Sequence, residues 1–377
     1  MTGTRAEYGI LKPVMKAIQA ERALRLQVVV TGMHLAAEFG RSARLVESDG
    51  FSISARVPMH AKDDSSAGMA RGVGRGVIGM TRALTKLAPD VVLVLGDRTE
   101  ALATTIAAAY LNIPVAHVHG GDKTEGGGLD ESARHAITKF AHLHFTATEQ
   151  SRLRVLRLGE DPRRVYLSGS PSLDAILSER LMSRSELERA LGFALSPRYL
   201  VLVQHPVSTD PDSAGPHMRE TMDAVEALGL QTIAIYPNSD AGGRAIAREL
   251  EKRRGVPGFH LFKNLPRERY LALLSGAAAL VGNSSSGMID AASFKVPVVN
   301  VGDRQRGRER GRNVLDCAPR KAAISSALRR ALFDRGFRRT LAGSRSPYGR
   351  GRAGVFIART LSRVSLNGGL LQKRLDY

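Results

Sequence analysis

The chain has 377 residues, more than one ordinary domain, and its hydrophobic content of 43% suffices for buried cores. No apolar run approaches the roughly 18 residues of a membrane span, and Arg5, Glu7 and Lys12 interrupt any secretory signal. A single cysteine, Cys317, excludes an intrachain disulfide and a CxxC metal site. These features predict a cytoplasmic protein with two domains and no membrane association.

The charge is strongly positive, with 55 basic against 36 acidic residues and a formal net charge of +19. Such an excess can indicate nucleic-acid binding. However, the arginines are scattered, aromatic residues make up only 5%, and no RNA- or DNA-binding motif is present. A basic surface is therefore the preferred interpretation, and nucleic acid is not an expected partner. A third interpretation assigns some arginines to an anionic substrate such as a nucleotide diphosphate.

Two blocks of alternating strand and helix patterns follow one another. In the first, the β-branched runs 91–95 and 115–118 enclose an alanine-rich helix, which predicts parallel strands joined by a right-handed crossover. The other predicted elements of this block are a loop at 1–9, a helix at 10–24, a strand at 26–31, helical and loop material around 41–46 and 51–57, a helix at 67–87, and strands at 142–147 and 165–167.

The pattern restarts after Gly169-Ser170-Pro171. Strands are predicted at 199–204, 231–236, 260–263, 279–281 and 297–301, and helices at 183–191, 217–227, 242–252 and 266–275, before a basic helical tail from residue 320. This alternation predicts two doubly wound α/β domains with a cleft between them as the natural site. The expected domains are 1–170 and 171–350, with a C-terminal helix in 351–377 packing back on the first.

The second block contains two stretches suited to phosphate. In Val281–Asp290, VGNSSSGMID, a strand ends, a serine loop follows and a helix begins near Gly287. Free N–H groups at a helix start and serine hydroxyls suit phosphate oxygens, although ordinary capping explains the same serines. Asp290 could accept hydrogen bonds from ribose hydroxyls. Beside this loop, the arginines of Gly302–Arg308 make a diphosphate site the favoured interpretation.

In the first block, Asp97, Asp122 and Asp130 lie in loops beyond adjacent strands, where ligands bind in open parallel sheets. Clustered carboxylates raise one another's pKa, which suits a general acid or base, although each alone is more readily a cap or an ion-pair partner. His119 and His205 each follow a strand, and two histidines facing one cleft favour catalysis.

A metal site built from His117, His119 and Asp122 is a weaker alternative. Their spacing matches no closed tetrahedral set of ligands, so no metal is predicted.

Nine ordered motifs together resemble one family, the hydrolysing UDP-N-acetylglucosamine 2-epimerases of sialic acid biosynthesis, which include the epimerase half of the animal bifunctional enzyme. The resemblance covers essentially the whole chain. The motifs are GTRAEYGILKP, TGMHLAAEFG, GDRTEALATTIAAAYLNIPVAHVHGGD, DESARHAITKFAHLHF, GSPSLD, QHPVS, YPNSDAGG, GNSSSG and GDRQRGR.

The resemblance implies a GT-B-like fold of two Rossmann-like domains with a UDP-sugar in the cleft. The implied reaction removes the C2 proton and eliminates UDP from C1. Water then adds to the 2-acetamidoglucal, giving N-acetylmannosamine and UDP without a metal or a nicotinamide cofactor. The family also implies a homo-oligomer, a dimer or a tetramer.

Individual roles are implied by position. Arg5 and Arg98 would approach the UDP diphosphate or the sugar. The remaining implied positions are acid/base or sugar-site residues Asp97, Asp130, Asp174 and His205, a sugar or diphosphate neighbour Asn238, phosphate binders Ser284 and Ser285, the ribose binder Asp290, and a further nucleotide contact Arg304.

Three departures from the family pattern stand out. His119 replaces a catalytic Glu of some members, with Asp122 as the nearest acid that could take over its role, so the C2 base is one of His119, Asp122 or Asp97. The ribose-binding acid is Asp290 instead of the usual Glu. The strand that precedes GTRAEYG in the family is absent before Met1, which suggests a recorded start inside the gene, with GTG for valine read as a start codon, and an unstable chain.

Close rivals remain open. A hydrolysing 2-epimerase for UDP- or GDP-N,N'-diacetylbacillosamine, toward legionaminic acid, shares these motifs. A non-hydrolysing epimerase is disfavoured, because its HVEAGLRT-like stretch is HVHGGDKT here. A GT-B glycosyltransferase would hold UDP similarly but release no free amino sugar, and a nucleic-acid-binding protein is suggested by charge alone.

Overall fold

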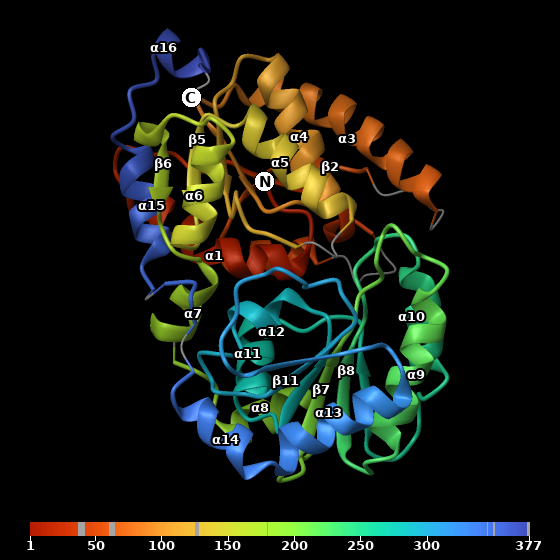
Figure 1. The fold of residues 1–377 in the computed structure, drawn as a ribbon. Helices are drawn as coiled ribbons and strands as arrows, with labels where there is room; N and C mark the ends of the chain where they lie inside the picture. Colours follow the sequence, from red (N-terminus) through yellow and green to blue (C-terminus); the bar gives the residue numbers. More distant parts are fainter. Residues whose placement is uncertain are drawn as a thin grey trace.

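The structure, a computed structural model, describes residues 1–36, 42–59, 65–124, 128–178, 180–344, 346–349 and 351–374. Figure 1 shows two lobes, with helix α1 (Arg5–Ala20) lying at the boundary between them. Each lobe is built on parallel strands flanked by helices, which confirms the α/β class with parallel sheets in a Rossmann-like arrangement in both lobes. No helix within the described ranges is long and apolar enough to cross a membrane.

The N-terminal lobe contains two groups of parallel strands, ordered β2-β1 and β3-β4-β5-β6. Its strands are β1 (Val28–Thr31), β2 (Ile53–Val57), β3 (Val92–Leu95), β4 (Val115–Val118), β5 (Leu143–Thr146) and β6 (Val165–Leu167). Its helices after α1 are α2 (Ala43–Ser48), α3 (Ser66–Leu87), α4 (Thr99–Tyr110), α5 (Leu129–Phe140) and α6 (Glu149–Arg157), followed by α7 (Ser172–Ser178).

Met1 and Thr2 lie between these two groups of strands. Thr2 forms a parallel bridge with Val30, and the Met1 amino group donates to the carbonyl oxygen of Leu93 at 3.1 Å. The chain then enters α1, so Arg5 sits beside the C-terminal ends of the flanking strands. The expectation of a further strand upstream stays a prediction.

The C-terminal lobe has one six-stranded parallel sheet in the order β12-β11-β10-β7-β8-β9. The strands are β7 (Tyr199–Val203), β8 (Gln231–Ile235), β9 (Phe259–Phe262), β10 (Ala279–Gly282), β11 (Val298–Val301) and β12 (Val314–Cys317). The helices are α8 (Arg184–Leu191), α9 (Ala214–Glu226), α10 (Gly243–Glu251), α11 (Arg267–Ser275), α12 (Ser285–Ile289), α13 (Lys321–Phe333) and α14 (Arg335–Ala342). The strand order reverses between β7 and β10, the point where doubly wound sheets bind ligands.

The last helices return to the first lobe. Helix α15 (Ala353–Leu361) packs along α1, and α16 (Gly368–Leu371) follows it, as the blue segment beside β6 in Figure 1 shows. The close approach requires Gly354, because a Cβ atom there would lie 2.8 Å from the carbonyl oxygen of Pro13. The domain boundaries at residues 170 and 350 stay predictions.

Several elements differ from the expectation, among them two strands and the start of one helix. Strands β2 and β12 were not expected. Both lie at sheet edges and are mostly half-exposed. They therefore lack the apolar run that is typical of buried parallel strands such as β7. Helix α1 begins at Arg5 instead of residue 10, because the Thr4 hydroxyl accepts from the backbone N–H of Glu7 and caps it.

Candidate active site

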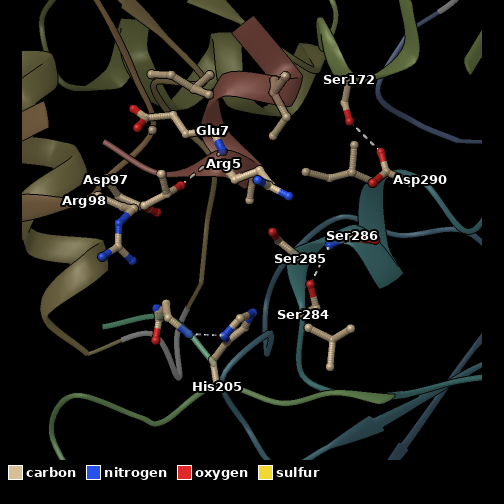
Figure 2. Close-up of a pocket in the computed structure, with 18 of the residues that line it drawn as sticks. Arg5, Glu7, Asp97, Arg98, Ser172, His205, Ser284, Ser285, Ser286 and Asp290 are labelled. Atoms are coloured by element: carbon tan, nitrogen blue, oxygen red, sulfur yellow. Dashed lines mark hydrogen bonds between the residues drawn. The ribbon is translucent and has the colours of Figure 1, made fainter. Parts of the chain in front are cut away.

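A cavity of about 310 Å³ lies between the lobes, at the C-terminal ends of both sheets. Figure 2 shows Asp97 and Arg98 on one side, the serines of α12 on the other, and His205 below. Twelve of the thirteen predicted site residues line it: Arg5, Asp97, Arg98, His119, Asp122, Asp130, His205, Asn238, Ser284, Ser285, Asp290 and Arg304.

Asp174 is the exception. Its carboxylate oxygens accept from the backbone N–H groups of Ala353 and Gly354, at 2.9 and 2.7 Å, and so cap α15. It does not line the cavity. The structure thus places this carboxylate where it holds the C-terminal helix against α1, and the expectation that Asp174 binds substrate stays a prediction.

Asp97, directly after β3, is held as a carboxylate. Burial alone would raise its pKa, but the guanidinium of Arg134, which is hydrogen-bonded to it, and the charges of Arg308 and Arg304 hold the pKa below its ordinary value. Arg134 is only 1% exposed and also donates to Glu131 and to the carbonyl oxygen of Asp122. Helix α5 thus fixes Asp97 through a fully engaged arginine.

Asp130, in the first turn of α5, has a raised pKa, in contrast to the lowered pKa of Asp97. Burial and the negative charge of Asp97 raise its pKa to about 7, although Arg304 opposes the shift. Arg304 reaches Asp130 from the loop after β11, with 3.2 Å between Nη2 and Oδ2. Two neighbouring carboxyl groups with pKa values pushed apart are the arrangement that supplies both an acid and a base near neutral pH.

His119 and Asp122 form a buried chain that ends at Ser170. His119 Nδ1 lies 3.1 Å from Asp122 Oδ2, and His119 Nε2 lies 2.9 Å from Ser170 Oγ. Burial alone would raise the pKa of Asp122, but His119 and Arg308 hold it far below its ordinary value. His119 has a φ of 68°, a left-handed backbone that costs energy for a non-glycine residue. Both of its ring nitrogens are engaged within the protein.

His205, just after β7, is a neutral hydrogen-bond donor. Burial and the nearby charges of Arg304 and Arg98 lower its pKa well below its ordinary value. The backbone N–H of Asn238 donates to His205 Nδ1 at 3.0 Å. The neutral ring therefore carries its proton on Nε2.

The opposite wall is built from the loop after β10 and from α11. Gly282 permits this loop, because its φ is 117° and a Cβ there would lie 2.1 Å from the carbonyl oxygen of Val203. Asp290 is 2% exposed and pairs with Arg267 at 2.9 Å through each of its oxygens, while Ser172 Oγ donates to it at 2.5 Å. In this arrangement Asp290 is fully engaged.

Several cavity residues were not assigned roles from the sequence. Arg134 and Arg308 belong to the motifs DESARH and GDRQRGR, so the family resemblance could have identified them. Arg267 and Tyr270 lie on α11 outside every quoted motif and are brought to the cavity only by the fold. Glu7, two residues after Arg5, is also buried there, and burial raises its pKa to about 7.

Positive charge dominates the cavity, which is lined by seven arginine or lysine side chains and five carboxylates. The Nε atoms of Arg5 and Arg308 are buried without a hydrogen-bond partner among the described residues. Unsatisfied buried guanidinium groups are costly, and an anion in the cavity would satisfy them.

The alternative metal ligand His117 faces elsewhere. Its Nε2 lies 2.8 Å from the carbonyl oxygen of Gly96 and its Nδ1 3.2 Å from Thr138 Oγ1. Burial lowers its pKa to about 3. Within the part of the chain that the structure describes, no three His, Cys, Asp or Glu residues are grouped as metal ligands.

Comparison with known proteins identifies the family. The model of the UDP-N-acetylglucosamine 2-epimerase family matches residues 16–362. A Legionella pneumophila protein named UDP-N,N'-diacetylbacillosamine 2-epimerase (hydrolyzing) is 40% identical over 332 residues, covering 88% of each chain. A Neisseria meningitidis UDP-N-acetylglucosamine 2-epimerase is 32% identical over 331 residues, covering 88% of this chain and 86% of that protein.

The fold agrees. The crystal structure of the Methanocaldococcus jannaschii UDP-GlcNAc 2-epimerase in complex with UDP-GlcNAc and UDP superimposes with a TM-score of 0.77 at 18% identity, covering 96% of this chain and 98% of that one. This likeness supports the GT-B-like arrangement of the two sheets. The family match and the hydrolysing relative at 40% identity establish that the chain belongs to the hydrolysing UDP-N-acetylglucosamine 2-epimerase family.

Proposed function

We propose that the protein hydrolyses a UDP-linked 2-acetamido sugar with inversion at C2, releasing UDP and the free 2-epimeric sugar. The observation that carries the proposal is the pair Asp97 and Asp130, whose pKa values are driven apart in a cavity rich in arginine. Elimination needs a base at C2 and stabilisation of a departing diphosphate, and this cavity offers groups for both.

The departing UDP would lie between Arg5, Arg304 and the serines of α12. Arginine forms strong, charge-assisted hydrogen bonds with phosphate oxygens, and the serine hydroxyls add neutral donors. The Nε2–H of His205 would donate to the same diphosphate, since a neutral imidazole that already accepts at Nδ1 acts as a donor and not as a base. These contacts strengthen as negative charge develops on the leaving group.

Proton transfer falls to Asp97 and Asp130 in this proposal. Asp97 stays ionised and can accept the C2 proton, whereas Asp130, with a pKa of about 7, exchanges its proton near neutral pH. His119 and Asp122, engaged with Ser170 and Arg308, act through the position of the loop after β4 and not as the base.

The identity of the sugar is inferred from two relatives. The hydrolysing relative for UDP-N,N'-diacetylbacillosamine is 40% identical, against 32% for the Neisseria UDP-N-acetylglucosamine 2-epimerase at similar coverage. This difference favours the diacetylated sugar, which carries an acetamido group at C4 and a methyl group at C5, over N-acetylglucosamine, the sugar that the family resemblance implied.

The test incubates the full chain with each UDP-sugar in deuterated water and follows the products by NMR. We expect release of UDP and of a free sugar epimerised at C2 and carrying solvent deuterium there. A UDP-sugar epimerised with its C1 bond intact would indicate a non-hydrolysing enzyme. Absence of UDP release from both sugars would overturn the proposal.

A further inference from the structure

Among the described residues, arginine–carboxylate pairs join the two lobes beside the cavity. Arg98 of the first lobe reaches Asp240 at 3.2 Å. In the other direction, Arg304 reaches Asp130 at 3.2 Å and Arg308 reaches Asp122 at 3.4 Å. These carboxylates therefore occupy guanidinium groups that an anionic ligand would also need.

The Arg304 pair is the one best suited to exchange. Arg304 Nη1 donates to the carbonyl oxygen of Asn283 at 3.3 Å, which holds the guanidinium beside Ser284 and the serine loop. Its Nη2 makes the contact with Asp130. A diphosphate at the serine loop would therefore meet the same guanidinium that now faces Asp130.

The other pairs resist exchange. Arg98 also donates to Ser239 and Glu100, at 3.3 and 3.2 Å, so it is anchored at three points. Asp122 keeps its charge because its pKa is far below the ordinary value, and losing Arg308 would leave a buried carboxylate uncompensated. Asp130 differs, since a carboxyl group with a pKa of about 7 can take a proton when its cation leaves.

We propose that the diphosphate of the nucleotide displaces Asp130 from Arg304, so that nucleotide binding is coupled to the uptake of one proton by the Asp130 carboxylate. The inference rests on the proposed function, because it assumes that UDP binds at the serine loop. The proton comes from solvent, the Asp130 carboxylate becomes a carboxylic acid, and both changes reverse when UDP leaves. Asp130 is then a proton donor only while nucleotide occupies the cleft.

Several charged groups around Asp130 determine its pKa during this exchange. Asp97 and Asp240 face it with negative charge, and Arg98 and Arg304 with positive charge. Its own helix adds Glu131 and Arg134, which are paired with each other. Removing Arg304 and adding a phosphate both favour the protonated form, so the two effects have the same sign.

Calorimetric titration of UDP into the full chain at pH 8, in two buffers with different ionisation enthalpies, counts the protons. Free UDP is already ionised at this pH, so uptake reports the protein. We expect roughly half a proton or more per UDP at pH 8. At about pH 5.5, where Asp130 is protonated in both states, the proton count should equal that of Asp130→Asn, because any proton carried by free UDP contributes equally in both proteins.

Two variants isolate the pair. Asp130→Asn should lose the uptake at pH 8 and bind UDP as tightly as the wild type or more tightly, because a competing carboxylate is gone. Arg304→Gln should also lose most of the uptake and bind UDP about 10-fold more weakly. Arg306→Ala is the matched control: it lies in the same loop with its side chain 61% exposed, and should retain full uptake.

The failures are distinguishable. UDP binding with the same proton count in the wild type and in both variants would overturn the exchange and leave the proposed function standing. If UDP does not bind to the wild type, both proposals fall. Circular dichroism of each variant verifies the fold, and the two substitutions approach the pair from opposite lobes, so neither result depends on a single variant folding.

Discussion

The two walls of the cavity are organised differently. On the C-terminal wall, Ser284, Ser285 and Asp290 come from one stretch of seven residues around a short helix, and Asp290 is neutralised by Arg267 of the same lobe. On the N-terminal wall, Asp97 and Asp130 come from separate loops, and Arg304 of the other lobe contributes to both of their pKa values.

We infer from this difference that the C-terminal wall serves nucleotide binding and the N-terminal wall serves proton transfer. A wall whose charges are balanced within its own lobe keeps its geometry when the cleft opens. A wall whose protonation depends on arginines of the opposite lobe is set for proton transfer only when the lobes are together. We therefore expect substitutions on the C-terminal wall to affect affinity and stability, and substitutions on the N-terminal wall to affect turnover.

The largest expected effect is at Asp97. Asp97→Asn should reduce kcat by at least about 100-fold, because the neutral amide cannot accept the C2 proton. UDP affinity, measured by calorimetry, should change little. The control is Asp303→Asn, in the exposed loop beside Arg304 with a side chain 75% exposed. A normal kcat in Asp97→Asn would show that the base lies elsewhere.

Arg267→Ala tests the other wall. Asp290 is 2% exposed, so removing its partner leaves a buried carboxylate without compensation. We expect a loss of about 3 kcal/mol in the free energy of unfolding, measured with urea. In the protein that remains folded, KM should rise more than kcat falls. A kcat loss as large as that of Asp97→Asn would contradict the separation of the walls.

Asp130 makes stability depend on pH. Its pKa is raised to about 7 in the folded protein against about 3.9 in an unfolded chain. The folded state therefore binds the proton more tightly, and this stabilisation is full below about pH 4 and lost as the pH rises through 7. Between pH 5 and pH 8, the unfolding free energy of the wild type should fall relative to Asp130→Asn by on the order of 2 kcal/mol. Parallel pH profiles of the two proteins would contradict a raised pKa.

The smallest effect is expected at Asp174, outside both walls. Asp174→Asn weakens the cap of α15 and should lower the unfolding free energy by about 1 kcal/mol. Both kcat and UDP affinity should stay at wild-type values. A lower kcat or a weaker UDP affinity without a loss of stability would indicate that Asp174 contributes to the substrate site, contrary to its position in the structure.

The sequence alone determined much of this protein. Buried parallel strands consist almost entirely of apolar residues, as in β7, so ten of the twelve strands formed by the described residues could be predicted together with their alternation with helices. The ordered motifs predicted the family, and residues that directly follow buried strands, such as Asp97, His119 and His205, were predicted to face one cleft because strand ends meet at one edge of a sheet.

Only the tertiary structure decided how these residues are charged and paired. Strand β12 lacks an apolar run, and Arg267 lies outside every quoted motif. Neither the strand nor the cavity position of Arg267 could therefore be predicted from the neighbouring sequence. The sequence could not separate Asp97 from Asp130, because their pKa values depend on burial and on Arg134 and Arg304, which are distant in the chain. Electrostatic interactions act through space, whereas a sequence pattern records only neighbours along the chain.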